Sequence, residues 1–308
     1  PLPGAREGLP YALTFPQKRP GSSEGAVLSA SPSGLGSDCA TLVVMSRSKQ
    51  LRHVRSLLLV PVALLAACAT TSAPEPSSTE ITVLIWNILH GADDEGELNL
   101  EAKGRYIAEQ AADLVLLQEI AENCERTGGI DQMAVLGEIT GMSPAFGSFM
   151  PYQGGRYGLG TLSGLPVTES RTFRLPEGGE PRVALLQKMQ VRGRTLLVAN
   201  LHFDWRDDDS ARFAQARALL AELDTLDLPM IVAGDFNDIP ESRTMQAFFT
   251  AGFVTAESPG PSFNARTPTI DIDHILIRSG PGLELESLGG EVLDEPTLSD
   301  HRPVVGRI

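Results

Sequence analysis

Basic residues are scarce in this sequence. Its 308 residues contain 25 Lys and Arg against 39 Asp and Glu, which gives a formal net charge of −14 at pH 7. A protein that holds long nucleic acids by neutralising phosphates needs clustered basic side chains, so this balance disfavours that class. Hydrophobic residues make up 42% of the chain, and a chain of this size can bury a core without disulfides. Disorder throughout the chain is therefore excluded.

The sequence also lacks an apolar run long enough to span a bilayer comfortably, which takes about 20 residues. The main candidate, residues 57–67, is short and ends at Cys68. It follows Met45 and a basic stretch, a pattern typical of a secretory signal peptide. The basic residues of that stretch are Arg47, Lys49, Arg52 and Arg55. Residues 1–44, rich in Pro, Gly and Ser, are predicted to be an upstream or non-structural extension.

The end of the apolar run identifies the kind of signal. Leu65-Ala66-Ala67-Cys68 resembles the bacterial lipoprotein signal, in which the cysteine is acylated and becomes the first residue of the mature chain. The alternative is an ordinary secretory peptide with an incidental cysteine. We predict a signal peptide at 45–67, a Ser/Pro/Thr-rich linker at 68–79 and one domain at 80–308. This organisation implies a lipid-anchored monomer of the bacterial envelope, either periplasmic or at the outer membrane, that contacts the membrane through Cys68.

Cysteine is scarce as well, with only three residues. Cys39 lies in the predicted extension and Cys68 would carry lipid, which leaves Cys124 without a partner. A disulfide framework is therefore excluded. Loss of residues 1–67 would remove seven of the 25 basic residues and three of the 39 acidic residues. The remaining 241 residues would contain 18 basic and 36 acidic residues, a net charge of −18.

From residue 80 onward, apolar runs of strand length alternate with polar turns and a few stretches of helical spacing. No internal repeat or second linker is visible, so a single α/β domain is predicted. Strands are expected at 81–86, 114–117, 158–162, 183–191, 195–201, 230–233, 272–277 and 303–308, and helices at 100–112, 133–139 and 210–223.

Polar side chains stand at the ends of these expected strands, where α/β folds place ligand-binding groups. Asn87 ends the first strand, although an Asn there could be a plain turn residue. Glu119 follows an apolar strand, where a carboxylate is costly unless it meets a cation. Mg²⁺ suits it, since this ion prefers carboxylate oxygens and water. The alternative for Glu119 is a solvated loop residue.

Two further clusters follow buried strands. Asn200, His202 and Asp204 alternate with apolar residues, so they are expected to share one face. In Gly234-Asp235-Phe236-Asn237, the glycine permits a tight turn from which two polar groups project.

Two Asp-His pairs lie near the C-terminus. Asp273 stands between apolar residues that should be buried, so its charge needs a partner. A histidine is the usual partner of such an aspartate in catalysis, and His301, which follows Asp300, could supply it.

The order of these polar residues along the chain, from Asn87 to His301, resembles the pattern of the endonuclease/exonuclease/phosphatase superfamily. The resemblance covers about residues 80–308 and implies a four-layer α/β sandwich, two packed β-sheets flanked by helices. Residues 158–163 resemble the family's Gly-Asn-Ala-hydrophobic-Leu-Ser strand, with Leu159 in place of the Asn. Tyr157, just before it, is expected to pack in the strand rather than contact phosphate.

The resemblance also implies roles. Glu119, with Asn87 and Asp300, would hold Mg²⁺ or Mn²⁺. Asp235 would orient or deprotonate the attacking water and Asn237 would help to position it. His301, oriented by Asp273, would contact phosphate or transfer a proton, and His202 would stabilise the transition state or assist the leaving group.

These features predict a divalent-metal-dependent phosphoesterase acting on phosphodiesters or phosphomonoesters. A secreted nuclease acting on DNA or RNA is one alternative, for which Arg156, Arg182 and Arg206 could form a local phosphate patch, although the charge disfavours a polymeric substrate. An envelope anchor makes a phospholipid, a nucleotide or a small organophosphate at least as plausible. The other alternative, a catalytically inactive lipoprotein that serves as a binding module, is disfavoured because the whole set of polar residues is present.

Overall fold

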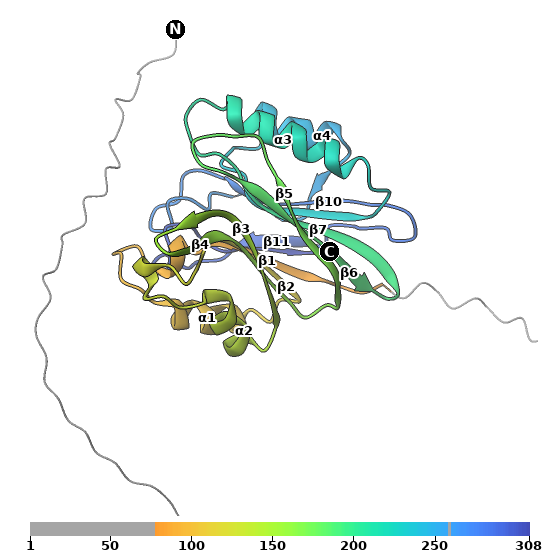
Figure 1. Cartoon of the computed structure of the whole chain (residues 1–308). Coiled ribbons are helices and arrows are strands. Elements are labelled where there is room, and N and C mark those ends of the chain that lie inside the picture. The colour runs from red at the N-terminus through yellow and green to blue at the C-terminus, as the bar shows by residue number, and fades with distance from the viewer. Residues whose placement is uncertain (1–77, 258–259) are drawn as a thin grey trace, which may run out of the picture. The chain divides into compact units, whose positions relative to one another are not determined.

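The computed structural model describes residues 78–257 and 260–308, which build two six-stranded β-sheets (Figure 1). The first sheet contains, in spatial order, β11 (Gly289–Val292), β12 (Val304–Arg307), β1 (Thr82–Asn87), β2 (Leu114–Glu122), β4 (Gly155–Ser163) and β3 (Ser143–Tyr152). The second contains β5 (Val167–Arg174), β6 (Val183–Val191), β7 (Arg194–His202), β8 (Met230–Asp235), β10 (Asp273–Arg278) and β9 (Val254–Thr255).

The helices cover the outer faces of the two sheets (Figure 1). Helices α1 (Leu100–Glu109) and α2 (Gln132–Thr140) pack on the first sheet, whereas α3 (Ser210–Leu223) and α4 (Arg243–Thr250) pack on the second. Short 3-10 turns lie at η1 (Leu89–Gly91) and η2 (Glu125–Thr127). The predicted four-layer α/β sandwich is confirmed.

The inner faces of the sheets form a shared core. Val83 and Ile85 of β1 pack with Val198 of β7 and Ile231 of β8, and all four are buried. Each sheet is centred on a parallel pair, β1 with β2 and β7 with β8. These strands are covered on both faces, which explains their nearly continuous apolar runs.

The structure differs from the sequence prediction mainly at the sheet edges. Strands β3 and β5, which were not predicted, stand at the outer ends of the two sheets. The β3 strand contains Pro144 and Pro151, which are tolerated on an edge strand, and β5 is largely exposed, so neither shows an apolar period. Strands β9 and β11 and the eight-residue helix α4 were also missed.

Strand β2 is longer than predicted. We expected it to end at Leu117, but it continues to Glu122 through an irregularity between Leu117 and Ile120. Glu119 lies within this bulge with a φ of +64°. A bulge redirects side chains, so the polar residues that we took to mark the end of the strand are part of it.

The predicted extension, signal peptide and lipidation site at Cys68 lie outside the described residues and stay predictions. Within the described part of the chain, Cys124 is buried and forms no disulfide. No helix there has the length and apolar character needed to cross a membrane.

Candidate active site

Three strands of the second sheet place polar residues side by side at one end. Asp235, the last residue of β8, pairs with His202 on the parallel strand β7 and with Asp273 on the antiparallel strand β10. Gly234 makes this arrangement possible, because a Cβ atom there would lie 2.1 Å from the carbonyl oxygen of Leu201. All three polar residues are buried.

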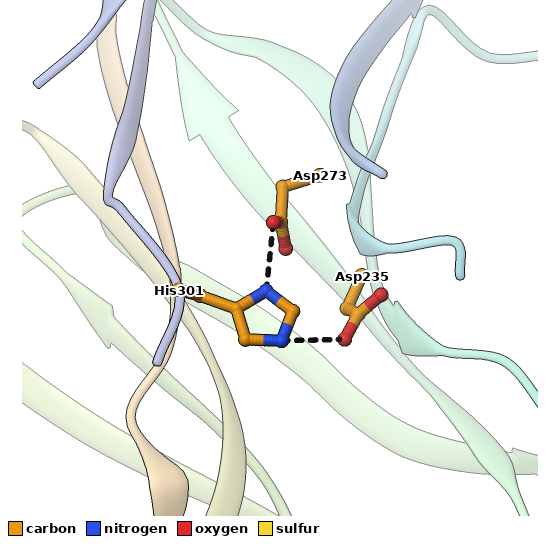
Figure 2. Close-up of side chains that lie close together, drawn as sticks. All are labelled: Asp235, Asp273 and His301. Atoms are coloured by element: carbon orange, nitrogen blue, oxygen red, sulfur yellow. Dashed lines mark hydrogen bonds and ion pairs between the residues drawn. The ribbon is translucent and has the colours of Figure 1, made fainter. Parts of the chain in front are cut away.

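His301 lies between two of these carboxylates (Figure 2). Its Nδ1 donates a hydrogen bond of 2.8 Å to Asp273 Oδ2, and its Nε2 lies 3.7 Å from Asp235 Oδ2. Burial alone would lower the pKa of His301, but the charges of Asp273 and Asp235 raise it well above its usual value. These charges favour the imidazolium form of His301.

The partners of His301 are themselves held in place. The hydroxyl of Ser262, which is fully buried, donates a 2.6 Å hydrogen bond to Asp273 Oδ2. The indole nitrogen of Trp86 donates to the carbonyl oxygen of His301 at 2.8 Å. Sequence reasoning did not find Ser262, because it lies in a loop with no recognisable motif.

Asp235 is the most contacted carboxylate of the site. Its Oδ1 accepts from the backbone N–H of Asn237 at 2.9 Å and its Oδ2 from the side-chain amide of Asn87 at 3.1 Å. Burial and then repulsion by Asp273 raise the pKa of Asp235, and the charge of His301 only partly offsets this. A carboxylate with a raised pKa is a stronger proton acceptor, as a general base must be.

Asn237 and His202 complete this side of the site. Asn237 adopts a φ of +52°, and its side-chain nitrogen donates to the Phe203 carbonyl oxygen at 3.1 Å. His202 Nε2 lies 3.3 Å from Asp235 Oδ2, and Nδ1 has no hydrogen-bond partner among the described residues. Burial, followed by the charge of Arg182, lowers the pKa of His202 well below its usual value. Burial and this charge favour the neutral form of His202.

The first sheet contributes Glu119 and Asn87. Glu119 Oε1 accepts from the Asn87 amide at 3.2 Å, and Oε2 accepts from the Tyr157 hydroxyl at 2.6 Å. His90 Nδ1 lies 3.9 Å from Oε2. Burial would raise the pKa of Glu119, but the nearby imidazole of His90 and the hydrogen bond from Tyr157 lower it well below its usual value. Tyr157 packs on its neighbours as predicted, and its link to Glu119 was missed.

Asp300 completes the set from the loop before β12. Its Oδ1 lies 3.3 Å from the Ser299 hydroxyl, which donates to it. Burial raises the pKa of Asp300, and repulsion by Glu119 adds to this effect. The structure thus brings together all the residues predicted for the site: Asn87, Glu119, His202, Asp235, Asn237, Asp273, Asp300 and His301.

Two groups of oxygens in the site could bind a cation. Asp235, Asp273 and His301 have potential ligand atoms within 4.8 Å of one another. However, Nδ1 of His301 is already used by Asp273, and the positive charge of the ring accounts for the closeness of the two carboxylates. Glu119 and Asp300 repel each other, and Asn87 lies beside Glu119, with its amide nitrogen donating to Glu119 and its Oδ1 accepting from the backbone N–H of Leu89 at 3.2 Å. Hard oxygen donors of this kind fit Mg²⁺ or Mn²⁺.

Several residues near the site in sequence stabilise the fold and do not belong to the active-site cluster. Asn200 donates to the carbonyl oxygens of Gly160 at 2.8 Å and Leu117 at 3.1 Å and so links the two sheets. His274 Nδ1 lies 3.5 Å from Glu257, not in the site beside Asp273. Leu159, which stands where the family strand has Asn, is fully buried in the apolar core.

The three arginines considered for a phosphate patch lie in different surroundings. Arg156 and Arg206 are largely exposed and form ion pairs with Glu122 and Asp204. Arg182 is only 3% exposed and carries its charge close enough to lower the pKa of His202. Of the three, therefore, only Arg182 is tied to the site by a described interaction.

Comparison with known proteins agrees with this geometry. A model of the Endonuclease/Exonuclease/phosphatase family matches residues 84–301, from β1 to His301. The chain belongs to this family. A UPF0294 protein of Vibrio cholerae is 32% identical over 134 residues, which cover 41% of this chain and 45% of that protein. The chain thus spans less than half the length of this curated relative.

Solved structures share the endonuclease/exonuclease/phosphatase fold. A family member from Beutenbergia cavernae superposes with a TM-score of 0.61 at 20% identity over 74% of this chain and 71% of that one. A mannosyl-6-phosphatase from Bacteroides thetaiotaomicron superposes with a TM-score of 0.59 at 20% sequence identity, over 74% of this chain and 99% of that one. Sphingomyelinase C from Streptomyces griseocarneus superposes with a TM-score of 0.58 at 19% sequence identity, over 75% of this chain and 99% of that one. At these identities the similarity establishes the fold, and members of the family act on phosphate esters.

Proposed function

We propose that this protein is a divalent-metal-dependent hydrolase of phosphodiesters or phosphomonoesters. The observation that carries the proposal is the buried cluster in which His301 bridges Asp273 and Asp235, beside His202 and Glu119. It contains a proton acceptor, a fixed cationic donor and a separate oxygen-rich group. Such an arrangement suits the attack of water on a phosphate ester.

The residues of the chain would act in three ways. Asp235 would accept a proton from the attacking water, and the backbone of Asn237 holds one oxygen of Asp235 in place. The His301 imidazolium would donate to a phosphate oxygen through Nε2 while Asp273 holds Nδ1. Neutral His202 would hydrogen-bond the phosphate or the leaving group.

Glu119, Asn87 and Asp300 would hold Mg²⁺ or Mn²⁺. A divalent cation bound there would polarise the phosphoryl oxygen and offset the negative charge that builds up during attack. An acidic protein needs such compensation in order to accept an anionic substrate.

A substrate panel tests the proposal and the alternatives together. The purified domain from Glu80 onward, with Mg²⁺ or Mn²⁺, would be offered a chromogenic phosphodiester, a sugar phosphate, inositol phosphates, sphingomyelin, plasmid DNA and RNA. We expect selective turnover of one class of ester. Turnover of DNA or RNA alone would identify the nuclease alternative. Absence of any turnover, with no metal binding by calorimetry, would favour an inactive binding module.

We further propose that Cys68 is lipidated and attaches the protein to the bacterial envelope. Cys68→Ala should abolish palmitate labelling and move the protein from the membrane to the soluble fraction, because a membrane anchor of this kind depends on the acyl chains. Cys124→Ala is the matched control, since Cys124 lies buried within the domain and this variant keeps Cys68. Unchanged membrane association of the Cys68 variant would contradict the proposal.

A further inference from the structure

Two arginines share one aromatic surface beside the site. The Cζ atom of Arg126, which belongs to η2, lies 4.4 Å from the ring centre of Tyr157 and 4.5 Å from that of Tyr152. The Cζ atom of Arg182 lies 5.0 Å from the ring centre of Phe149. The rings of Phe149 and Tyr157 are 5.1 Å apart, so the two guanidinium groups lie on neighbouring members of one aromatic cluster.

Both guanidinium groups keep donors that nothing in the described chain satisfies. Nε and Nη1 of Arg182 are buried without a hydrogen-bond partner, and only Nη2 approaches a carboxylate, Glu180, at 3.3 Å. Nε and Nη2 of Arg126 are likewise buried without a partner, although the residue as a whole is half-buried. Buried charged donors without acceptors are costly. Four such nitrogens beside one site indicate a missing acceptor.

Each of the two arginines is linked to a site residue. Arg126 contacts Tyr157, whose hydroxyl donates to Glu119 at 2.6 Å. Arg182 acts electrostatically on His202. By contrast, Arg156 and Arg206 have carboxylate partners, Glu122 and Asp204. Arg182 pairs with Glu180 through Nη2 alone. In a protein with an excess of acidic residues, the remaining donors of the two arginines, which have no partner, suit an anionic ligand.

We propose that Arg126 and Arg182 form a phosphate-binding subsite at the side of the active site. This inference rests on the proposed function and names a part of the substrate that the site would hold. A guanidinium group offers a planar fork of donors that matches phosphate oxygens, and stacking on aromatic rings keeps the fork in place. The phosphate is either the group that is hydrolysed or a second phosphate of the same molecule.

The first test measures binding of inorganic phosphate to the metal-free domain by calorimetry. Arg126→Gln and Arg182→Gln should each weaken binding at least about tenfold, in line with the loss of a charge-assisted hydrogen bond. Arg156→Gln and Arg206→Gln are the matched controls and should bind like the wild type. Equal affinity in all four variants, or no phosphate binding by the wild type, would overturn the subsite.

Folding of each variant is checked by thermal melting. Since Arg182 is buried, its Gln variant could fail to fold. In that case phosphate binding is measured in Arg126→Gln and Arg182→Lys instead. If Arg126 only supported Tyr157, its replacement would lower kcat and leave phosphate binding to the metal-free domain unchanged, which would also contradict the subsite.

The second test distinguishes the two sources of phosphate in the metal-loaded enzyme. A sugar monophosphate and the corresponding bisphosphate are compared in wild type and Arg126→Gln. A similar rise in KM for both assigns the subsite to the hydrolysed group, and a rise for the bisphosphate alone assigns it to a second phosphate. Unchanged KM for both would refute the subsite. Arginine-dependent phosphate binding without turnover of any ester would instead refute the proposed hydrolysis and leave the subsite standing.

Discussion

Asp235→Asn should lower kcat by about 10³ for whichever phosphate ester the enzyme hydrolyses, because removal of a general base costs 10²–10⁴ in rate. Asn keeps the shape of the side chain and the contacts of Oδ1 with the Asn237 N–H. It removes the one carboxylate that meets His202, His301 and Asn87 together. Steady-state kinetics with the metal-loaded protein measure the loss. Activity within about tenfold of the wild type would exclude Asp235 as the base.

The same variant should be no less stable than the wild type above neutral pH. The pKa of Asp235 is raised in the folded protein, so its charged form is disfavoured there. A raised carboxyl pKa reduces folding stability as the pH rises from its ordinary pKa through the raised one. Asn carries no such charge. Thermal melts of the metal-free proteins at pH 5 and pH 8 should show the Tm of the variant improving relative to the wild type at the higher pH.

His301→Asn should also lower kcat by about 10² to 10⁴, because it removes the donor to the phosphate. Its effect on stability should be the opposite of that of Asp235→Asn. Without the imidazolium ion, the buried carboxylates of Asp273 and Asp235 lose the cation between them. Breaking a buried ion pair in this way destabilises a protein by about 3–5 kcal/mol.

The loss of folding stability in His301→Asn depends on pH because the pKa of His301 is raised in the folded protein. A histidine with a raised pKa stabilises the fold fully below its ordinary pKa, and the contribution disappears as the pH rises through the raised value. The difference in Tm between wild type and His301→Asn should therefore shrink toward alkaline pH in the metal-free proteins. A difference that grows as the pH rises above neutral would contradict a charged His301. His274→Asn, at a histidine outside the site, is a control for nonspecific effects on kcat.

Much of the site was predictable because buried strands leave a clear signal in the sequence. Strands β7 and β8 are mainly apolar and run parallel, so the polar residues that end them, His202 and Asp235, emerge at the same end of the sheet. The pairing of Asp273 with His301 followed from the need of a buried carboxylate for a partner.

Other features depend on contacts that no local pattern encodes. The alternation of Asn200, His202 and Asp204 predicted one shared face, which holds for Asn200 and His202 on β7. Asn200, however, links the two sheets and is not part of the catalytic cluster. Asp204 lies beyond the end of β7, where it binds Arg206 and the backbone N–H of Gly179. The roles of Tyr157 and Arg126 likewise arise from packing between segments that are distant in sequence.

The most direct test of the proposed function is the rate of phosphate ester hydrolysis by the wild-type domain after metal removal and replacement. Dialysis against EDTA should abolish hydrolysis of the preferred ester, and added Mg²⁺ or Mn²⁺ should restore it in the wild type but not in Glu119→Gln, which loses a charged oxygen ligand. Hydrolysis that continues undiminished in EDTA, or that returns fully in Glu119→Gln, would contradict a metal-dependent phosphoesterase built on these residues.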